Sequence, residues 1–291
     1  MKRIFLNVLI ILFIQISSAQ SIGIGTSNPD SSSQLEITST TKGFLPPRMT
    51  FAQRNAITNP VSGLMIWNTD CLEIQVYNGT VWTNMIGGPI TCVPVPTVTI
   101  CDQVWMQKNL DVDHYRNGDI IPHVTDSLEW QNLTTGAWCY YNNDSATYAA
   151  VYGKLYNWFA VNDGRGLAPL TWHVPSEAEW TNLTDNCLGG LDVAGGKMKD
   201  TGTAHWINPN TGATNSSGFA GLPGGQRYYN NSSGSVTFGL IGQGGYWWSS
   251  TPSFYYGPRA WFCRLAYNSA NAFRTPYGSR PAGFSVRCVR D

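Results

Sequence analysis

The chain has 291 residues, of which 42% are hydrophobic, 13% aromatic and only 12% charged. This length is sufficient for one domain with a sizeable core and a smaller unit beside it. The low charge and the 30 glycines favour short strands and ordered loops, because long surface helices need more Glu, Lys and Arg. With 18 basic and 18 acidic residues and no basic stripe, the composition argues against nucleic acid as a partner.

The first residues have the pattern of a secretory signal. Lys2 and Arg3 form a charged start, residues 4–16 are largely apolar, and residues 17–19 are small, as signal peptidase requires. We therefore expect residues 1–19 to be a signal peptide and the mature chain to be secreted or displayed at the cell surface. The apolar run is shorter than the roughly 20 residues of a membrane span, so no span is expected.

Residues 20–86 predict a small β-rich segment. A short helix is expected over residues 48–57, and strands over 63–68, 72–77 and 80–82. Asn78-Gly79 separates the last two strands and predicts a hairpin turn, because both residues tolerate positive φ. Gly and Pro over residues 87–96 predict a linker. Residues 97–291 then remain as one larger domain.

The larger domain begins with strand patterns at Val98–Ile100 and Gln103–Met106. A short helix is expected within Gly153–Val161. The next helix is better marked, since Ser176 and Glu179 have the spacing of a capping box and Gly189-Gly190 predicts its end. The last strand candidate is Phe284–Val289.

Cysteine usage favours disulfides over metal binding. The chain lacks a CxxC pair, and export permits disulfide formation. An odd count leaves at least one thiol unpaired or joined to another chain, and the spacing does not fix the connectivity. The seven cysteines are Cys71, Cys92, Cys101, Cys139, Cys187, Cys263 and Cys288.

Several sequence words occur in one order along residues 97–291. They include "VTICDQVWMQKNLDVDHYRNGDIIP", "YGKLYNWFAVND", "TWHVPSEAEWTNLT", "GYWWSST" and "FSVRCVRD". This order resembles the Fibrobacter succinogenes major paralogous domain family, which is regarded as akin to the C-type-lectin-like fold. The resemblance implies an α+β domain with two short helices, a small antiparallel sheet and long ordered loops. Ala168 stands where members usually have Cys, so a disulfide of the family would be missing here.

The first part has its own resemblance. The words "SIGIGTSNPDSSSQLEI", "KGFLPPRMTFAQRNAI" and "VYNGTVW" are similar to leaders of exported Bacteroidetes proteins. Such leaders look like stalk or tail-fibre segments, some of them trimeric. The resemblance implies a presenting role and a homo-oligomer formed through the N-terminal segment.

Few residues carry an enzyme pattern. Glu177 and Glu179 point to different sides of a helix, and His173 has the pattern of a packed, hydrogen-bonded histidine rather than a base. The "WHVPSEAEW" word resembles one in formylglycine-generating enzymes, which use a cysteine pair near the C-terminus. In that role Cys263 and Cys288 would be reactive, but their surroundings do not match, and a disulfide is the favoured interpretation. No catalytic residue is therefore expected.

Calcium-dependent sugar binding would need several oxygens converging on one ion. The lectin words EPN, QPD and WND are absent. Asn142, Asn143, Asp144 and Asp163 supply candidate oxygens, but turns favour the same residues. We expect no cofactor, with calcium as the alternative.

The tail from Gly245 to Arg280 combines Tyr, Trp, Asn, Ser and Arg, a mixture typical of antibody binding loops. It also resembles the variable regions that diversity-generating retroelements rewrite. We expect a ligand-binding face supported by packed Trp247, Trp248 and Trp261. The predicted face consists of Ser253, Phe254, Tyr255, Tyr256, Tyr267, Asn268, Asn271, Arg274, Tyr277 and Ser279.

These observations predict a ligand-binding protein, with adhesion to an extracellular glycan or surface protein as its role. An enzyme or maturation factor with a reactive cysteine is the first alternative. A structural fibre or matrix component is the second, and it requires stable oligomers of the N-terminal segment.

Overall fold

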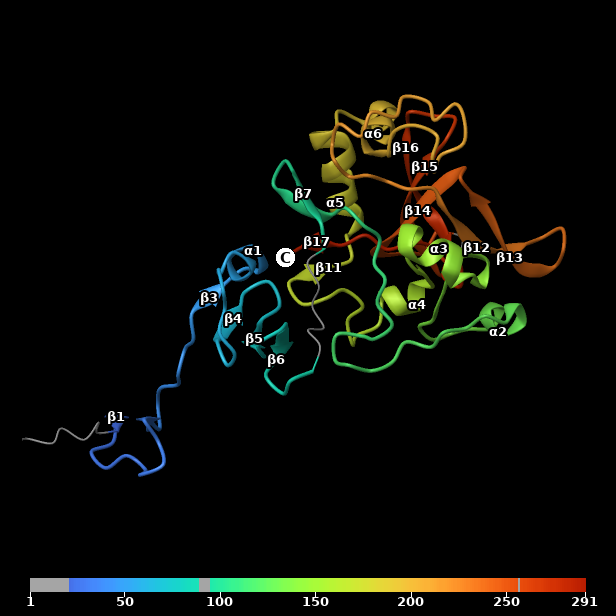
Figure 1. Ribbon diagram of the computed structural model, residues 1–291. Helices are drawn as coiled ribbons and strands as arrows, with labels where there is room; N and C mark the ends of the chain where they lie inside the picture. Colours follow the sequence, from blue (N-terminus) through green and yellow to red (C-terminus); the bar gives the residue numbers. More distant parts are fainter. Residues whose placement is uncertain (1–20, 89–94, 256) are drawn as a thin grey trace, which may run out of the picture. The chain divides into compact units, whose positions relative to one another are not determined.

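The computed structural model describes residues 21–88, 95–255 and 257–291 (Figure 1). The predicted signal peptide, most of the predicted linker and the candidate Tyr256 lie outside the described residues. The described residues divide into two compact units, residues 21–69 with 73–88, and residues 70–72 with the described residues from 95 to the C-terminal end. No helix in the described ranges combines the length and the apolar run needed to cross a bilayer.

The first unit is β-rich, as predicted. A parallel pair of strands comes first, and a four-stranded sheet of order β3-β4-β5-β6 follows it, with the short helix α1 (Phe51–Asn55) beside it. The strands are β1 (Ile22–Ile24), β2 (Leu35–Ile37), β3 (Arg48–Met49), β4 (Met65–Asn68), β5 (Glu73–Tyr77) and β6 (Trp82–Asn84).

The helix expected over residues 48–57 is shorter than predicted. Thr50 caps it through a capping box with Gln53, so the helix cannot begin before Phe51. Arg48 and Met49 instead pair with β4. The Asn78-Gly79 turn is confirmed, since Gly79 has a φ of 101° and Tyr77 lies opposite Trp82 across the hairpin.

The second unit is a mixed α+β domain with several small sheets, where the sequence predicted one. Its sheets have the orders β11-β17-β8-β7, β9-β10, β12-β13 and β14-β15-β16. The strands are β7 (Thr97–Ile100), β8 (Gln103–Met106), β9 (Trp138–Cys139), β10 (Leu155–Tyr156), β11 (Trp172–His173), β12 (Gly224–Asn230), β13 (Ser235–Ile241), β14 (Gly244–Ser253), β15 (Arg259–Ala266), β16 (Ala272–Ser279) and β17 (Val289–Arg290).

Its described residues also contain more helices than the two that were expected. Most are a single turn or two, as the low charge predicts. They are α2 (Ser127–Gln131), the 3-10 turn η1 (Tyr141–Asn143), α3 (Ser145–Tyr152), α4 (Trp158–Val161), α5 (Glu177–Thr181), the π-helical η2 (Asn182–Cys187) and α6 (Leu191–Met198).

Helix α5 confirms the capping-box prediction. The Ser176 hydroxyl accepts from the Glu179 backbone N–H, and the Glu179 carboxylate accepts from the Ser176 backbone N–H at 2.7 Å. The helix continues through η2, and the chain then turns at Gly189 and Gly190, whose φ angles are 85° and 103°. Trp180 is buried on the inner face.

Two other element predictions need correction. In Gly153–Val161 only the last four residues are helical, because Asn157 caps α4 while Leu155 and Tyr156 pair with β9. The strand expected at Phe284–Val289 is mostly irregular, with single bridges from Phe284 to Tyr156 and from Ser285 to Trp247.

Three fully buried cations hold the loops of the second unit. Arg287 donates to the carbonyl oxygens of Met106 and Phe219, and Arg227 donates to three consecutive carbonyls at residues 124–126. Lys199 donates to the carbonyls of residues 211, 266 and 269 at 2.8–3.0 Å. Each cation therefore links its own segment to backbone carbonyls that lie mostly in loops, and it gives these carbonyls a buried donor.

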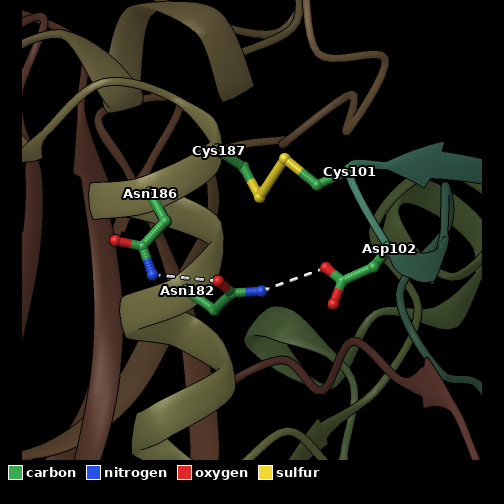
Figure 2. Close-up of a disulfide and its surroundings, with 5 residues drawn as sticks. All are labelled: Cys101, Asp102, Asn182, Asn186 and Cys187. Atoms are coloured by element: carbon green, nitrogen blue, oxygen red, sulfur yellow. Dashed lines mark hydrogen bonds between the residues drawn. A yellow bond between two sulfur atoms is a disulfide. The ribbon is translucent and has the colours of Figure 1, made fainter.

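A disulfide joins Cys101, in the turn between β7 and β8, to Cys187 at the end of η2 (Figure 2). Their Cα atoms are 5.9 Å apart. Beside it, Asn182 donates to Asp102 at 3.2 Å and accepts from Asn186 at 3.0 Å. Cys71 is also disulfide-bonded.

Removing the Cys101–Cys187 disulfide is expected to destabilise the second unit. The bond closes a loop with a sequence separation of 86 residues, and loss of such a bond typically costs about 2–5 kcal/mol. The double variant C101A/C187A should show a lower urea midpoint than the mature wild type. A midpoint equal to that of the wild type would contradict a structural role for this bond.

His173 lies between two carboxylates. Its ring nitrogens are 2.7 Å from the Asp291 carboxylate and 2.6 Å from the Glu179 carboxylate. Partial burial opposes protonation of His173, but the hydrogen bonds to Glu179 and Asp291 outweigh it and raise its pKa above 6.5. Burial raises the pKa of Glu179, but hydrogen bonds from Ser176 and His173 lower it overall below 4.5.

This pairing predicts a pH-dependent stability. The raised pKa of His173 adds stability below about pH 6.5, and this contribution is lost as the pH rises through the folded pKa. The lowered pKa of Glu179 adds stability that is lost as the pH falls below about 4.5. The urea midpoint of the wild type should therefore be higher at pH 5.5 than at pH 8.0. This difference should be smaller in H173Q. An identical pH dependence in both proteins would contradict this account.

Candidate functional site

The sheet β14-β15-β16 positions most of the predicted site residues (Figure 1). Its strands are antiparallel, with Trp247 opposite Cys263 and Cys263 opposite Arg274. The β14–β15 connection therefore lies at one end of the sheet and the β15–β16 connection at the other. Residues near 253–259 and residues 267–271 are consequently separated by the length of a strand.

The tryptophans predicted to support the site differ in burial. Trp247 and Trp248 are fully buried, and their indole N–H groups donate to Asn109 and to the carbonyl of Tyr156. They attach β14 to the body of the domain. Trp261 is only half-buried, so its ring contributes part of the surface.

Three predicted residues form an exposed aromatic tip at one end of the sheet. We define the aromatic tip as Phe254, Tyr255 and Tyr277, whose exposed fractions are 78%, 63% and 55%. The Tyr255 and Tyr277 rings meet edge to face with centroids 6.3 Å apart. Ser253 is buried beneath them and accepts from the Tyr255 backbone N–H, while Ser279 pairs with Arg259 at the same end.

The remaining predicted residues lie elsewhere, so the ten candidates do not form one face. Tyr267, Asn268 and Asn271 belong to the opposite connection, which Lys199 clamps through its carbonyls. Tyr267 packs on a core cluster and Asn271 donates to Asp192. The sequence could not show which candidates lie at which end of the sheet, because the register of the strands determines their positions.

Arg274, a predicted ligand contact, is held by ion pairs within the domain. Its guanidinium pairs with Glu177 and with Asp185, both at 2.7 Å, and it also contacts the Thr181 hydroxyl. The side chain is 12% exposed. It therefore ties β16 to α5 and η2.

Two predicted site residues, Asn271 and Arg274, line a groove on the β14-β15-β16 sheet, but the sequence analysis did not predict the groove itself. Tyr246, Arg264 and Phe273 lie directly opposite one another and share a face, as do Phe262 and Thr275 in the next row. With Gln226 and Leu240 from the β12–β13 hairpin and residues of α6, they line a cavity of about 730 Å³. The alternation of these residues within each strand was visible, but not the register that aligns them.

The sequence favoured disulfides for Cys263 and Cys288 without fixing their partners, and neither cysteine is disulfide-bonded. Both are free thiols with no exposed surface, and they belong to different core clusters. Burial raises the pKa of each thiol to about 12, so the nucleophilic thiolate is scarce at neutral pH. Cys288 shares its cluster with Ala168, the position where the resemblance implies a cysteine. Cys139 is a third buried free thiol, and Cys92 lies outside the described residues.

The candidate calcium oxygens have other partners. Asp144 caps α3 by accepting from the Thr147 backbone N–H, and Asp163 pairs with Arg165 at 2.8 Å. Asn142 and Asn143 have φ angles of 54° and 55° in a tight turn, which suits asparagine. In the described ranges, His, Cys, Asp and Glu form no cluster of three or more that would hold a metal ion.

Comparison with known proteins agrees with the order of the sequence words. Residues 98–290 match the Fibrobacter succinogenes major domain, and residues 23–100 match a phage tail like trimerisation region. No curated protein and no solved structure matches the chain. Because the first match covers about two thirds of the sequence and the resemblance is confirmed, the chain belongs to the Fibrobacter succinogenes major domain family.

Proposed function

We propose that this chain is a secreted or cell-surface binding protein. Its C-terminal domain, with a C-type-lectin-like arrangement, binds an extracellular glycan or surface protein non-covalently through the aromatic tip. Its N-terminal segment assembles three copies and presents the three domains together.

The observation that carries the proposal is the exposure of the aromatic tip. Three large Phe and Tyr rings are exposed on a domain whose tryptophans are mostly buried. Exposed Tyr and Phe side chains lose little conformational entropy on binding and offer large contact areas, and their faces stack on apolar faces of other molecules. The buried Trp247 and Trp248 fix the strand that leads to the tip, which reduces the cost of ordering the site on binding.

Two observations support trimer formation. The N-terminal residues match a trimerisation region. In addition, the parallel pair β1–β2 leaves Ile22, Ile24 and Leu35 more than half exposed, at 61%, 54% and 53%. A two-stranded sheet is marginally stable alone, and burying these side chains between copies would stabilise it. Three linked tips would also gain avidity on a surface that carries repeated ligands.

The binding proposal is tested by truncating the tip. The triple variant F254S/Y255S/Y277S should lose at least about 10-fold in affinity for the ligands found in a screen of glycans and envelope extracts, because aromatic anchors contribute much of the binding energy. Y229S is the matched control, since Tyr229 is 47% exposed on β12 and lies outside the tip. Absence of wild-type binding, or equal binding by the triple variant, would contradict the proposal.

The oligomer is tested by light scattering on the mature chain. The wild type should have three times the monomer mass, and I22S/I24S/L35S should dissociate towards monomers. I120S is the control, because Ile120 is 70% exposed in the second unit. A monomeric wild type would contradict the trimer, and an unchanged trimer in the triple variant would contradict this interface. A purely structural fibre component would trimerise yet show no dependence of binding on the tip.

A further inference from the structure

We propose that the groove on the β14-β15-β16 sheet is a second ligand site, which recognises the carboxylate of an acidic sugar through Arg264. This site uses residues outside the aromatic tip, and it assigns a chemical class of ligand that the proposed function leaves open.

Arg264 is held between two aromatic rings. Its guanidinium carbon lies 5.8 Å from the centroid of the Tyr246 ring and 5.5 Å from that of the Phe273 ring. Cross-strand pairing produces this arrangement, because β15 places Arg264 between Tyr246 on β14 and Phe273 on β16. The two rings restrict the guanidinium in advance of binding, which lowers the entropy cost of capturing an anion.

Within the described residues, no carboxylate pairs with Arg264. Its buried Nε has no hydrogen-bond partner there, which is also true of the Nε of Arg274, so the ion pairs are what distinguish the two arginines. Arg274 on the neighbouring strand provides the contrast, since its guanidinium pairs with Glu177 and Asp185. Leaving a partly buried cationic donor unsatisfied is unfavourable, and a ligand carboxylate supplies the matching planar acceptor.

The walls of the groove fit a sugar ring. Tyr246 forms a buried floor, and Phe273, 39% exposed, forms a side against which apolar C–H groups can stack. The Gln226 amide and the Thr275 hydroxyl are donors and acceptors suited to sugar hydroxyls. The cavity of about 730 Å³ lies within the range of about 300–1,000 Å³ typical of small-ligand sites.

The charge of the groove lining restricts the class of ligand further. Asp192 also lines the groove and accepts from Asn271 at 2.9 Å, so the lining contains an acid of its own. It would repel a polyphosphate, whose charges lie close together, more strongly than a glycan with one carboxylate on each sugar ring. A uronate, with one carboxylate on a hydroxylated ring, meets Arg264 with its carboxylate and the rings with its C–H face. We therefore infer a uronate-containing glycan in preference to a polyphosphate or an acidic peptide.

The test measures binding of trigalacturonate and of neutral trigalactose to the mature chain by calorimetry. The wild type should prefer the acidic sugar, and R264Q should lose about 10- to 100-fold in affinity for it and lose the preference. R264K should retain part of the affinity, because it keeps the charge but not the planar pair of donors. R259Q is the control, since Arg259 lies on the same strand at the tip end.

Several results would overturn the inference: equal affinity for acidic and neutral sugars, unchanged binding by R264Q with a wild-type melting temperature, or tighter binding of a hexaglutamate peptide. If R264Q does not fold, R264K with its intermediate affinity decides the question. The tip variant F254S/Y255S/Y277S should still bind trigalacturonate. Failure of Arg264 variants to affect binding therefore rejects the groove, whereas failure of the tip variant to affect the screened ligands rejects the proposed function.

Discussion

The second unit depends on buried cations that satisfy loop carbonyls. Arg287, Arg227 and Lys199 are each fully buried and each donates to backbone oxygens distant in sequence. A chain with 12% charged residues and short elements has many loop carbonyls without partners in regular structure. A buried side chain with several donors satisfies a group of these carbonyls, and this allows long irregular segments to be ordered. The fixed loops in turn hold the sheet β14-β15-β16.

That sheet packs in a core cluster on each side and leaves part of one side at the surface. Its inner side carries Trp247, Cys263 and Leu265, which pack in a core cluster, while Arg274 joins it to α5 and η2. Its other side carries Tyr246, Arg264 and Phe273, and its β14–β15 end carries the aromatic tip. Arg264 and Arg274 differ in the partners that their positions on the sheet provide. Arg274 and Arg264 lie on the same sheet, but only Arg274 has carboxylates within reach in the described part of the chain.

Local signals were readable from the sequence, and long-range pairing was not. The Ser176–Glu179 capping box and the Asn78-Gly79 turn involve residues within three positions of each other, so their chemistry predicts the structure. The sequence favoured disulfides for Cys263 and Cys288, but whether a cysteine meets a partner depends on packing between distant strands, and here both are buried free thiols in different clusters. For the same reason, the sequence did not show that the predicted ligand-binding residues lie at two ends of a sheet. Tyr255 and Asn271 lie in the same Tyr-, Asn- and Ser-rich stretch of the sequence. The register of the strands nevertheless places them at opposite ends of the sheet.

The central claim is that the ligands found in the screen bind at the aromatic tip of this C-terminal sheet. The most direct measurement is a crystal structure of the mature chain with the tightest ligand obtained from the glycan and envelope screen. Our account predicts ligand density against the rings of Phe254, Tyr255 and Tyr277, with Trp247 and Trp248 unmoved beneath. Density confined to another part of the domain, with the aromatic tip in contact with solvent alone, would contradict it.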